Sequence, residues 1–287
     1  MEATIKKRLY ADVEKLTSVK PPRNYLNLQS LNYIAQYIYD ELGKLDCKVN
    51  FQHFKVDGRD YKNVIASFGE QKGERIIVGA HYDVCGDQPG ADDNASAVAG
   101  LLETARILNE KKPNLKQQID FVAYTLEEPP YFASANMGSA VHAKFLHDNK
   151  IGVKAMICYE MIGYFSDKPN SQQFPSAELA KIYPHTGNFI IVVGKTGQEK
   201  YTQTVKKLMQ LHASIDVQTI NLPQEYGLAG LSDHRNYWQY NYEAVMINDT
   251  SFLRNPNYHQ TSDTIDTLDF DKMVEVVKGV YGVIVNL

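Results

Sequence analysis

Short apolar runs alternate with helical patterns along most of this chain, and this alternation narrows its possible folds more than any other feature. The run Arg75–Ala80 contains Ile-Ile-Val-Gly-Ala, which is expected of a strand covered on both faces. Strands that alternate with helices predict an α/β fold with a mostly parallel sheet between layers of helices. Eight runs are predicted to be strands: Lys48–Phe54, Asn63–Phe68, Arg75–Ala80, Ile119–Thr125, Lys154–Cys158, Phe189–Val193, Val217–Asn221 and Ala244–Ile247.

Helical periodicity fills most of the intervals between these runs, and no stretch of the chain has the composition of a linker. The interval 163–187 lacks this helical periodicity; it contains three prolines and is predicted to be an irregular excursion over the face of the sheet. We therefore predict a single domain, 1–287. The predicted helices are 2–18, 27–45, Asn94–Leu108, Ser139–Asp148, Lys200–Ala213 and Asp271–Val285.

The charge and apolar patterns exclude several classes of partner. The formal net charge is −4, without the basic stripe of a nucleic-acid binder. No apolar stretch reaches the roughly 18 residues of a membrane span. The first residues lack the apolar core of a signal peptide. The protein is predicted to be cytoplasmic as given, or secreted or periplasmic if a leader has been removed. Three scattered cysteines argue against a disulfide framework.

Five potential metal ligands recur at or just beyond the ends of predicted elements. They are His81, Asp93, Glu128, Glu160 and His259. Four of them lie at or just past apolar runs, and the fifth lies in a polar loop before the last helix. Ligands of open α/β sheets bind in the crevice at the carboxyl ends of the strands. Two imidazoles and three carboxylates gathered there would hold two divalent metals, which predicts a hydrolase.

Each of these residues also has an ordinary interpretation. A lone histidine after a strand is more often structural, Asp93 stands where a helix cap is expected, and adjacent acids often lie on a surface. Together they favour a site in which one of Glu127 and Glu128 binds metal while its neighbour stays free as a general base. Asp83 lies where it would accept a hydrogen bond from His81.

Two further features have competing interpretations. Asp233 and His234 form an acid–imidazole pair in Leu-Ser-Asp-His-Arg, where a helix cap explains the acid equally well. Cys85 follows His81 by four residues and would lie near the site, although a small buried apolar residue is the favoured interpretation.

These motifs, in this order, resemble the zinc-dependent aminopeptidases of peptidase family M28, from about the third strand to the last helix. The resemblance implies a mixed eight-stranded sheet between helices. It implies that one zinc is held by His81 and Glu160, the other by Glu128 and His259, and that Asp93 bridges them. A hydroxide between the metals would attack the scissile carbonyl, with Glu127 as the general base. Asp83 would then orient His81.

Two departures from the family pattern bear on the site. Residues 129–137 make a longer segment than in many relatives, and its Pro129-Pro130 would stiffen a wall of the substrate pocket. Glu160 stands where many members have Asp, so that either one or two zinc ions are expected. The mixed ligand set also admits manganese or cobalt.

The resemblance leaves alternatives open. Glutaminyl cyclases share the fold but use one zinc and typically carry a tryptophan before the last histidine, where this chain has Tyr258. A related carboxypeptidase would need arginines such as Arg235 or Arg254 to bind a substrate carboxylate. A non-catalytic descendant would usually have lost ligands, and this chain keeps all five and Glu127.

The expected partners are peptide substrates, with neither nucleic acid nor membrane. The substrate pocket is predicted to be built from 129–138, 163–187 and 222–231. Its aromatic residues predict an apolar or aromatic pocket, and Asp233, His234 and Tyr226 are the candidate residues around the substrate. The aromatic candidates are Tyr131, Phe132, Tyr164, Phe165 and Tyr226.

Overall fold

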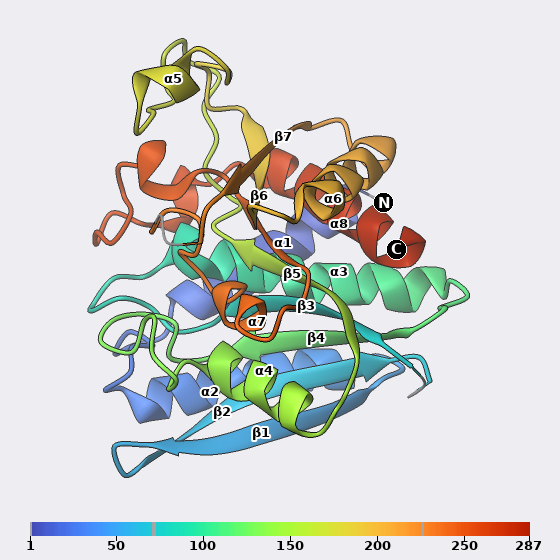
Figure 1. The fold of residues 1–287 in the computed structure, drawn as a ribbon. Coiled ribbons are helices and arrows are strands. Elements are labelled where there is room, and N and C mark those ends of the chain that lie inside the picture. The colour runs from blue at the N-terminus through green and yellow to red at the C-terminus, as the bar shows by residue number, and fades with distance from the viewer. Residues whose placement is uncertain (1, 71–72, 225–226) are drawn as a thin grey trace.

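A computed structural model describes residues 2–70, 73–224 and 227–287. Eight strands form one mixed sheet in the order β1-β2-β4-β3-β5-β8-β6-β7 (Figure 1). Four neighbouring pairs are parallel and three are antiparallel, as expected for a mixed, mostly parallel sheet. The strands are β1 Lys48–Val56, β2 Arg59–Phe68, β3 Arg75–His81, β4 Gln118–Tyr124, β5 Val153–Glu160, β6 Phe189–Lys195, β7 Asp216–Leu222 and β8 Ala244–Asn248.

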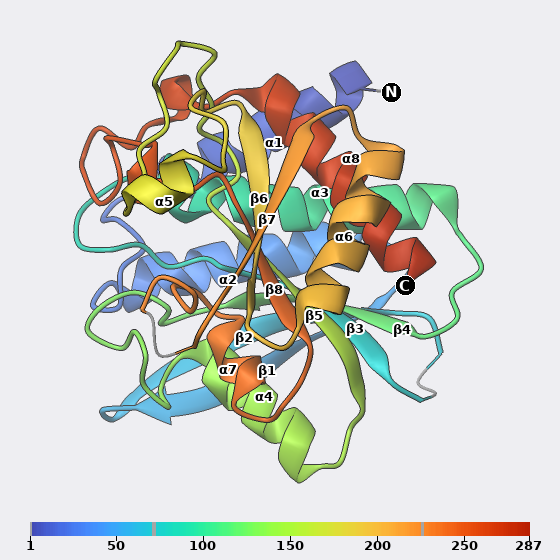
Figure 2. The same cartoon turned by 45° about the horizontal axis from the view of Figure 1, so that its top comes forward.

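Helices cover both faces of the sheet. In Figures 1 and 2 the helices α1, α3, α6 and α8 lie together on one side, whereas α4 and α7 lie on the other. The helix α2 packs against β2 on the same side as α1. The helices are α1 Glu2–Thr17, α2 Leu28–Gly43, α3 Ala97–Lys111, α4 Gly138–Asp148, α5 Ala177–Ala180, α6 Glu199–His212, α7 Arg235–Trp238 and α8 Phe270–Asn286, with short helical turns η1 Ala91–Ser96, η2 Ser251–Leu253 and η3 Ile265–Thr267.

The period-two pattern of the strands divides the core into two layers. In β3, Ile76 and Val78 face the larger cluster, with α1, α2, α3, α6 and α8, whereas Ile77 faces the smaller cluster with α4 and α7. Side chains of successive strand residues point to opposite faces, so a strand covered on both faces is apolar throughout. This explains why β3 is a continuous apolar run rather than an alternating one.

The sequence-based boundaries hold with local differences. The hairpin between β1 and β2 turns at Asp57 and Gly58, which adopt φ values of 49° and 75°, so both strands extend farther than their apolar patterns indicate. The helix predicted from Asn94 begins instead at Ala97, because η1 precedes it. Neither α5 nor α7 was expected, since four residues are too few to show a helical period.

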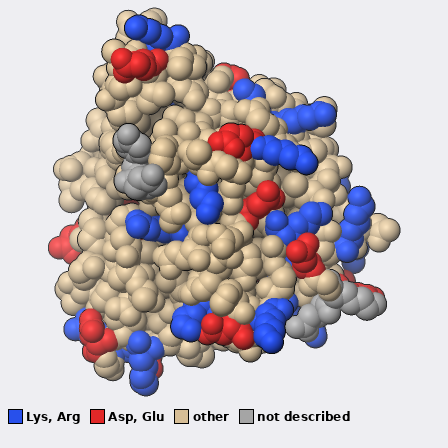
Figure 3. Space-filling model, viewed as in Figure 1, with Lys and Arg blue, Asp and Glu red and all other residues tan. Residues whose placement is uncertain are grey.

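Charged side chains of both signs are interspersed on the face shown in Figure 3. In the part of the chain that is described, no helix combines the length and the apolar character that crossing a bilayer requires.

Candidate metal centre

Three adjacent parallel strands bring acidic and imidazole side chains to one edge of the sheet. β4, β3 and β5 are neighbours in that order. His81 is the last residue of β3 and Glu160 the last residue of β5, while Glu127 and Glu128 follow β4 after a short turn. Because the carboxyl ends of parallel strands meet at one edge, these side chains converge there although they are far apart in the sequence.

Two loops bring in the remaining candidates. Asp93 lies within η1, where its φ and ψ of −102° and 91° depart from helical values. The carboxylate of Asp263 accepts hydrogen bonds from the backbone N–H of Asp92 at 2.9 Å and of Asp93 at 3.1 Å. His259 belongs to the same loop as Asp263. One buried carboxylate therefore joins the loop that carries Asp93 to the loop that carries His259.

Left-handed backbone recurs at this edge of the sheet. Leu126, Met161 and His259 have φ values of 62°, 47° and 56°. Bulky residues rarely adopt this conformation, and it concentrates at functional sites. At Leu126 and Met161 it turns the chain sharply, directly before Glu127 and directly after Glu160.

The five predicted ligands form two groups that share Asp93. The Nε2 atom of His81 lies 3.4 Å from Asp93 Oδ1 and 3.3 Å from Glu160 Oε2. The Nε2 atom of His259 lies 3.1 Å from Asp93 Oδ2 and 3.4 Å from Glu128 Oε2. Each carboxylate oxygen of Asp93 therefore faces a different imidazole. Such spacings allow one ion per group, because ligand atoms about 2.0–2.2 Å from a zinc ion lie a few ångströms from one another.

Several of these atoms are buried without a hydrogen-bond partner in the described part of the chain. They are Nε2 of His81 and of His259, Oδ1 of Asp93, and Oε1 of Glu127 and of Glu128. The carboxylate oxygens that face the two imidazole Nε2 atoms lie 3.1–3.4 Å away in contacts that do not satisfy these atoms as hydrogen bonds. Buried polar atoms without partners are unfavourable. A cation bound by these atoms would supply the missing interactions.

The crowding of charge shifts the pKa values of the carboxylates. Burial raises the pKa of Glu127 well above its usual value; His81 opposes this rise and Glu160 adds to it. Burial also raises the pKa of Glu128 to about 8, with Asp93 adding to the rise and His259 opposing it. Carboxylates gathered in a dry site cannot all be ionised unless positive charge is present.

The imidazoles supply that charge when they are protonated. Burial lowers the pKa of His259, but its contacts with Asp93 and Glu128 outweigh burial and raise the pKa to about 10. Burial also lowers the pKa of His81, but the negative charges of Glu160 and Glu127 outweigh burial and raise this pKa well above its usual value. Protons thus balance the acidic groups in the metal-free protein, and a bound cation would take their place.

Asp83 binds the backbone next to the candidate ligands. Its carboxylate accepts hydrogen bonds from the backbone N–H groups of Glu127 and Glu128, each at 3.2 Å. Its Oδ1 also lies 3.5 Å from Nδ1 of His81. The sequence suggested only the contact with His81. The structure adds that Asp83 fixes the backbone of the two adjacent glutamates.

Two side chains that the sequence analysis did not assign to the site hold Glu160. Ser232 donates a hydrogen bond to Glu160 Oε2 at 2.6 Å, and Asn94 donates to the same oxygen at 3.2 Å. Asn94 directly follows the candidate ligand Asp93, and Ser232 directly precedes the candidate Asp233. Adjacency to a candidate ligand was the only available signal, because these contacts join residues that are distant in the sequence.

The other candidates differ in position. Asp233 is fully buried, neither of its carboxylate oxygens has a hydrogen-bond partner among the described residues, and burial raises its pKa to about 7 although His81 opposes the rise. His234 contacts the carbonyl of Ala229 at 2.8 Å and the ring of Trp238 edge-on. Burial lowers the pKa of His234 to about 4. Tyr226 lies outside the described residues.

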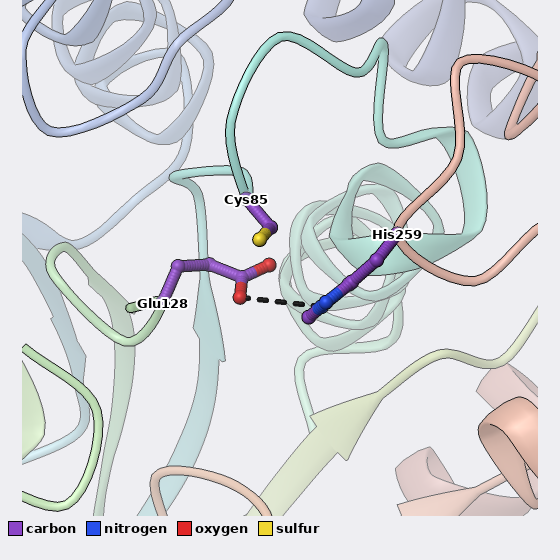
Figure 4. Close-up of side chains that lie close together, drawn as sticks. All are labelled: Cys85, Glu128 and His259. Carbon is purple, nitrogen blue, oxygen red and sulfur yellow. Dashed lines mark ion pairs between the residues drawn. The ribbon is translucent and has the colours of Figure 1, made fainter. Parts of the chain in front are cut away.

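Cys85 lies beside the second group of ligands. In Figure 4 its sulfur points toward the carboxylate of Glu128 and the ring of His259. Ligand atoms of these three residues all lie within 4.8 Å of one another. Burial raises the pKa of the Cys85 thiol to about 11, and Glu128 adds to the rise. Cys85 is half-buried and lies beside the candidate ligands, so it is not the small buried apolar residue that the sequence favoured.

Comparison with known proteins identifies the family. The sequence profile of peptidase family M28 matches residues 63–284, which include every predicted metal ligand. The chain belongs to peptidase family M28. It is therefore a hydrolase that acts on peptides, as the sequence predicted.

Relatives within and around this family support the assignment. The uncharacterized protein YfbL of Escherichia coli (strain K12) is 42% identical over 97% of this chain and 87% of its own length. A probable leucine aminopeptidase of Trichophyton verrucosum is 29% identical over 91% of this chain and 66% of its own length. The chain thus spans about two thirds of the fungal relative.

Solved structures share the fold. The LapA aminopeptidase of Legionella pneumophila has a TM-score of 0.79 at 21% identity, covering 99% of this chain and 72% of that chain. A glutaminyl cyclase of Bacteroides thetaiotaomicron has a TM-score of 0.75 at 19% identity, covering 98% of both chains. These likenesses show the M28 fold and do not separate the two activities.

Proposed function

We propose that this M28 protein is a di-zinc aminopeptidase that removes amino-terminal residues from peptides. The observation that carries the proposal is the pair of ligand groups on either side of Asp93. One group consists of His81, Asp93 and Glu160, and the other of Asp93, Glu128 and His259.

The donor set suits zinc. Imidazole nitrogens and carboxylate oxygens are both ordinary zinc ligands. The unpartnered atoms of His81, His259 and Asp93 are those that such ions would bind. When bound, zinc polarises a substrate carbonyl and makes water acidic enough to attack it near neutral pH. Three protein ligands in each group leave a position for water or substrate.

Glu127 is the proposed general base. It is buried next to both groups, and its Oε2 lies 3.8 Å from His81 Nε2. Its raised pKa suits a carboxylate that takes a proton from the attacking water and later delivers it to the leaving nitrogen. The peptide bond breaks as water adds across it, so that the products are an amino acid and a shortened peptide.

An apolar cavity of about 110 Å³ is the proposed pocket for the amino-terminal side chain. Its wall includes Leu231, next to Ser232, and Asn248, whose amide donates to the backbone carbonyl of Glu160. Phe174, Met246 and other apolar residues complete it. Its wall includes residues of 163–187 and 222–231, but Tyr164 and Phe165 are not among the described residues that line it, and Tyr226 lies outside the described residues. Preferential cleavage after charged residues would contradict this assignment.

The arginines give little support to a carboxypeptidase. Arg254 is buried, and its guanidinium donates to the backbone carbonyl of Phe189 and the side chain of Gln172. Arg235 donates to the carbonyl of Gly230. These bonds occupy Nε and Nη1 of Arg254 and Nη1 of Arg235, while Nη2 of Arg254 is buried without a partner among the described residues. Tyr258 stacks on the ring of His259, with ring centroids 3.8 Å apart, at the position where cyclases typically carry tryptophan.

The test is mass spectrometry of a peptide mixture incubated with the zinc-loaded protein. The mixture contains free and acetylated amino termini and an amino-terminal glutamine. Loss of single residues only from free amino termini is the expected result. Loss of ammonia from the glutamine peptide alone would instead establish a cyclase, and an unchanged mixture would refute both.

Substitution separates the base from the ligands. Glu127→Gln is expected to keep both zinc ions but to lose at least about 100-fold in kcat. The exposed Glu14→Gln serves as the matched control and should retain full activity. If Glu127→Gln lost zinc instead, the roles of base and ligand would have to be reassigned.

A further inference from the structure

The thiol of Cys85 faces one of the two ligand groups. Cys85 lies in the loop between β3 and η1, and its sulfur points toward Glu128 and His259 (Figure 4). One ligand atom from each of the three residues lies within 4.8 Å of the other two. Zinc binds sulfur at about 2.3 Å and nitrogen or oxygen at about 2.0–2.2 Å, so the donors around one tetrahedral ion are separated by about 3.4–3.6 Å, roughly 1 Å less than the upper limit here. A small side-chain adjustment therefore places all three donors on one ion.

A second observation points to a ligand at the same place. Glu128 is only 4% exposed, yet its Oε1 is buried without a hydrogen-bond partner in the described part of the chain. The Nε2 atom of His259 is likewise without a partner. Both side chains point toward the space that Cys85 faces (Figure 4). The thiol thus lies beside donors that already lack an interaction.

Hydrogen bonds hold the residues directly before and after Cys85. The N–H of Val84 donates to the carbonyl of Arg23 at 3.3 Å, and the side chain of Asn24 donates to the carbonyl of Gly86 at 2.7 Å. Gly86 has a φ of 57°, which allows the turn directly after the cysteine. Since both neighbours are anchored, the backbone that carries the thiol is held in place before an ion binds, and only the side chains need to adjust.

We infer that Cys85 is a fourth ligand for the ion held by Asp93, Glu128 and His259. The inference rests on the metal centre proposed above. On binding, the S–H bond breaks, its proton passes to solvent, and the thiolate sulfur donates an electron pair to the ion. The two ion positions then differ. The position with Cys85 has four protein ligands and would take water or substrate only as a fifth ligand, whereas the position with His81 and Glu160 has three protein ligands and an open fourth position.

A thiolate also changes which metal this position prefers. Sulfur is a soft ligand that favours zinc, cadmium and cobalt over magnesium and manganese. We therefore expect Cys85→Ser to weaken cadmium binding at least about 10-fold, a loss in the range seen when metal-site residues are removed. Manganese binding should change less than about 2-fold.

Absorption spectroscopy of the cobalt-loaded protein tests the ligand directly. Metal-free protein is titrated with Co²⁺, and we expect a near-ultraviolet thiolate-to-cobalt charge-transfer band that saturates at one equivalent. The band should vanish in Cys85→Ser. It should persist in Cys47→Ser, the matched control, because Cys47 is equally half-buried but its thiol contacts the carbonyl of Leu42.

The outcomes separate this inference from the proposed function. Visible cobalt bands without the charge-transfer band would show an ion bound only by nitrogen and oxygen, which overturns the role of Cys85 and leaves the metal centre intact. The same near-ultraviolet band in Cys85→Ser would also overturn it. Failure to bind cobalt at all would overturn both the metal centre and the fourth ligand.

Discussion

Arg23 is a buried arginine whose partners are backbone carbonyls rather than carboxylates. It is 2% exposed, and its guanidinium donates to the carbonyls of Tyr82 at 2.8 Å, Leu16 at 3.0 Å, Pro89 at 2.6 Å and Gly90 at 2.7 Å. Three of these carbonyls belong to the loop between β3 and η1. Arg23 therefore fixes the segment that connects His81 to Asp93.

Arg23→Lys tests this role because it keeps the charge but removes the planar, forked donor group. A single ammonium group cannot reach four carbonyls that surround a guanidinium, so we assume that at least two carbonyls lose their donor. Each buried acceptor left without a partner costs about 1–3 kcal/mol. We expect the free energy of unfolding to fall by about 3 kcal/mol. Zinc affinity should fall roughly 10-fold, because the loop would no longer be held.

The assays are urea denaturation of the metal-free protein and zinc binding by chelator competition. The exposed Arg59→Lys is the matched control, and its stability should stay within about 0.5 kcal/mol of the parent protein. If Arg23→Lys unfolded at the same urea concentration as the parent and bound zinc equally well, the bonds to the loop would not fix the metal centre.

Three further predictions concern the ligands and the helical layer. Zinc binding should release at least about one proton at pH 7 and should tighten as the pH rises. The reason is that His259 and Glu128, with pKa values of about 10 and 8 in the metal-free protein, must give up protons to bind. Calorimetry in buffers of different ionisation enthalpy measures the number of protons released. Ser232→Ala removes the 2.6 Å donor to Glu160 and should weaken zinc binding by about 10-fold in chelator competition. Arg106→Leu removes the guanidinium that pairs with the buried Asp12 and should lower the free energy of unfolding by about 3–5 kcal/mol in urea.

Each of these predictions has a contradicting result. Zinc affinity that does not vary with pH would mean that the ligands are already deprotonated. An unchanged zinc affinity in Ser232→Ala would show that the second donor, Asn94, holds Glu160 alone. A stable Arg106→Leu protein would show that Asp12 and Glu41 tolerate the loss of their buried partner.

The sequence was informative wherever a periodic pattern placed a residue at a strand end. His81, Glu128 and Glu160 follow apolar runs, and adjacent parallel strands bring such ends together whatever lies between them. The non-helical backbone of Asp93 was not predictable, because it depends on bonds from Asp263, 170 residues away along the chain. Arg23 gave no signal for the same reason, since its partners are backbone atoms that only the folded chain brings near.

The carboxylate of Asp263 makes two ligand-carrying loops into one cooperative unit. The amides of Asp92 and Asp93 are bonded to it, so their hydrogen exchange with solvent requires the 259–263 segment to detach. An ion bound by both Asp93 and His259 would join the same two loops at a second point. Amide exchange at Asp92 and Asp93 should therefore slow when zinc is added. These two amides would then report that the 259–263 segment has closed, although they belong to a different loop.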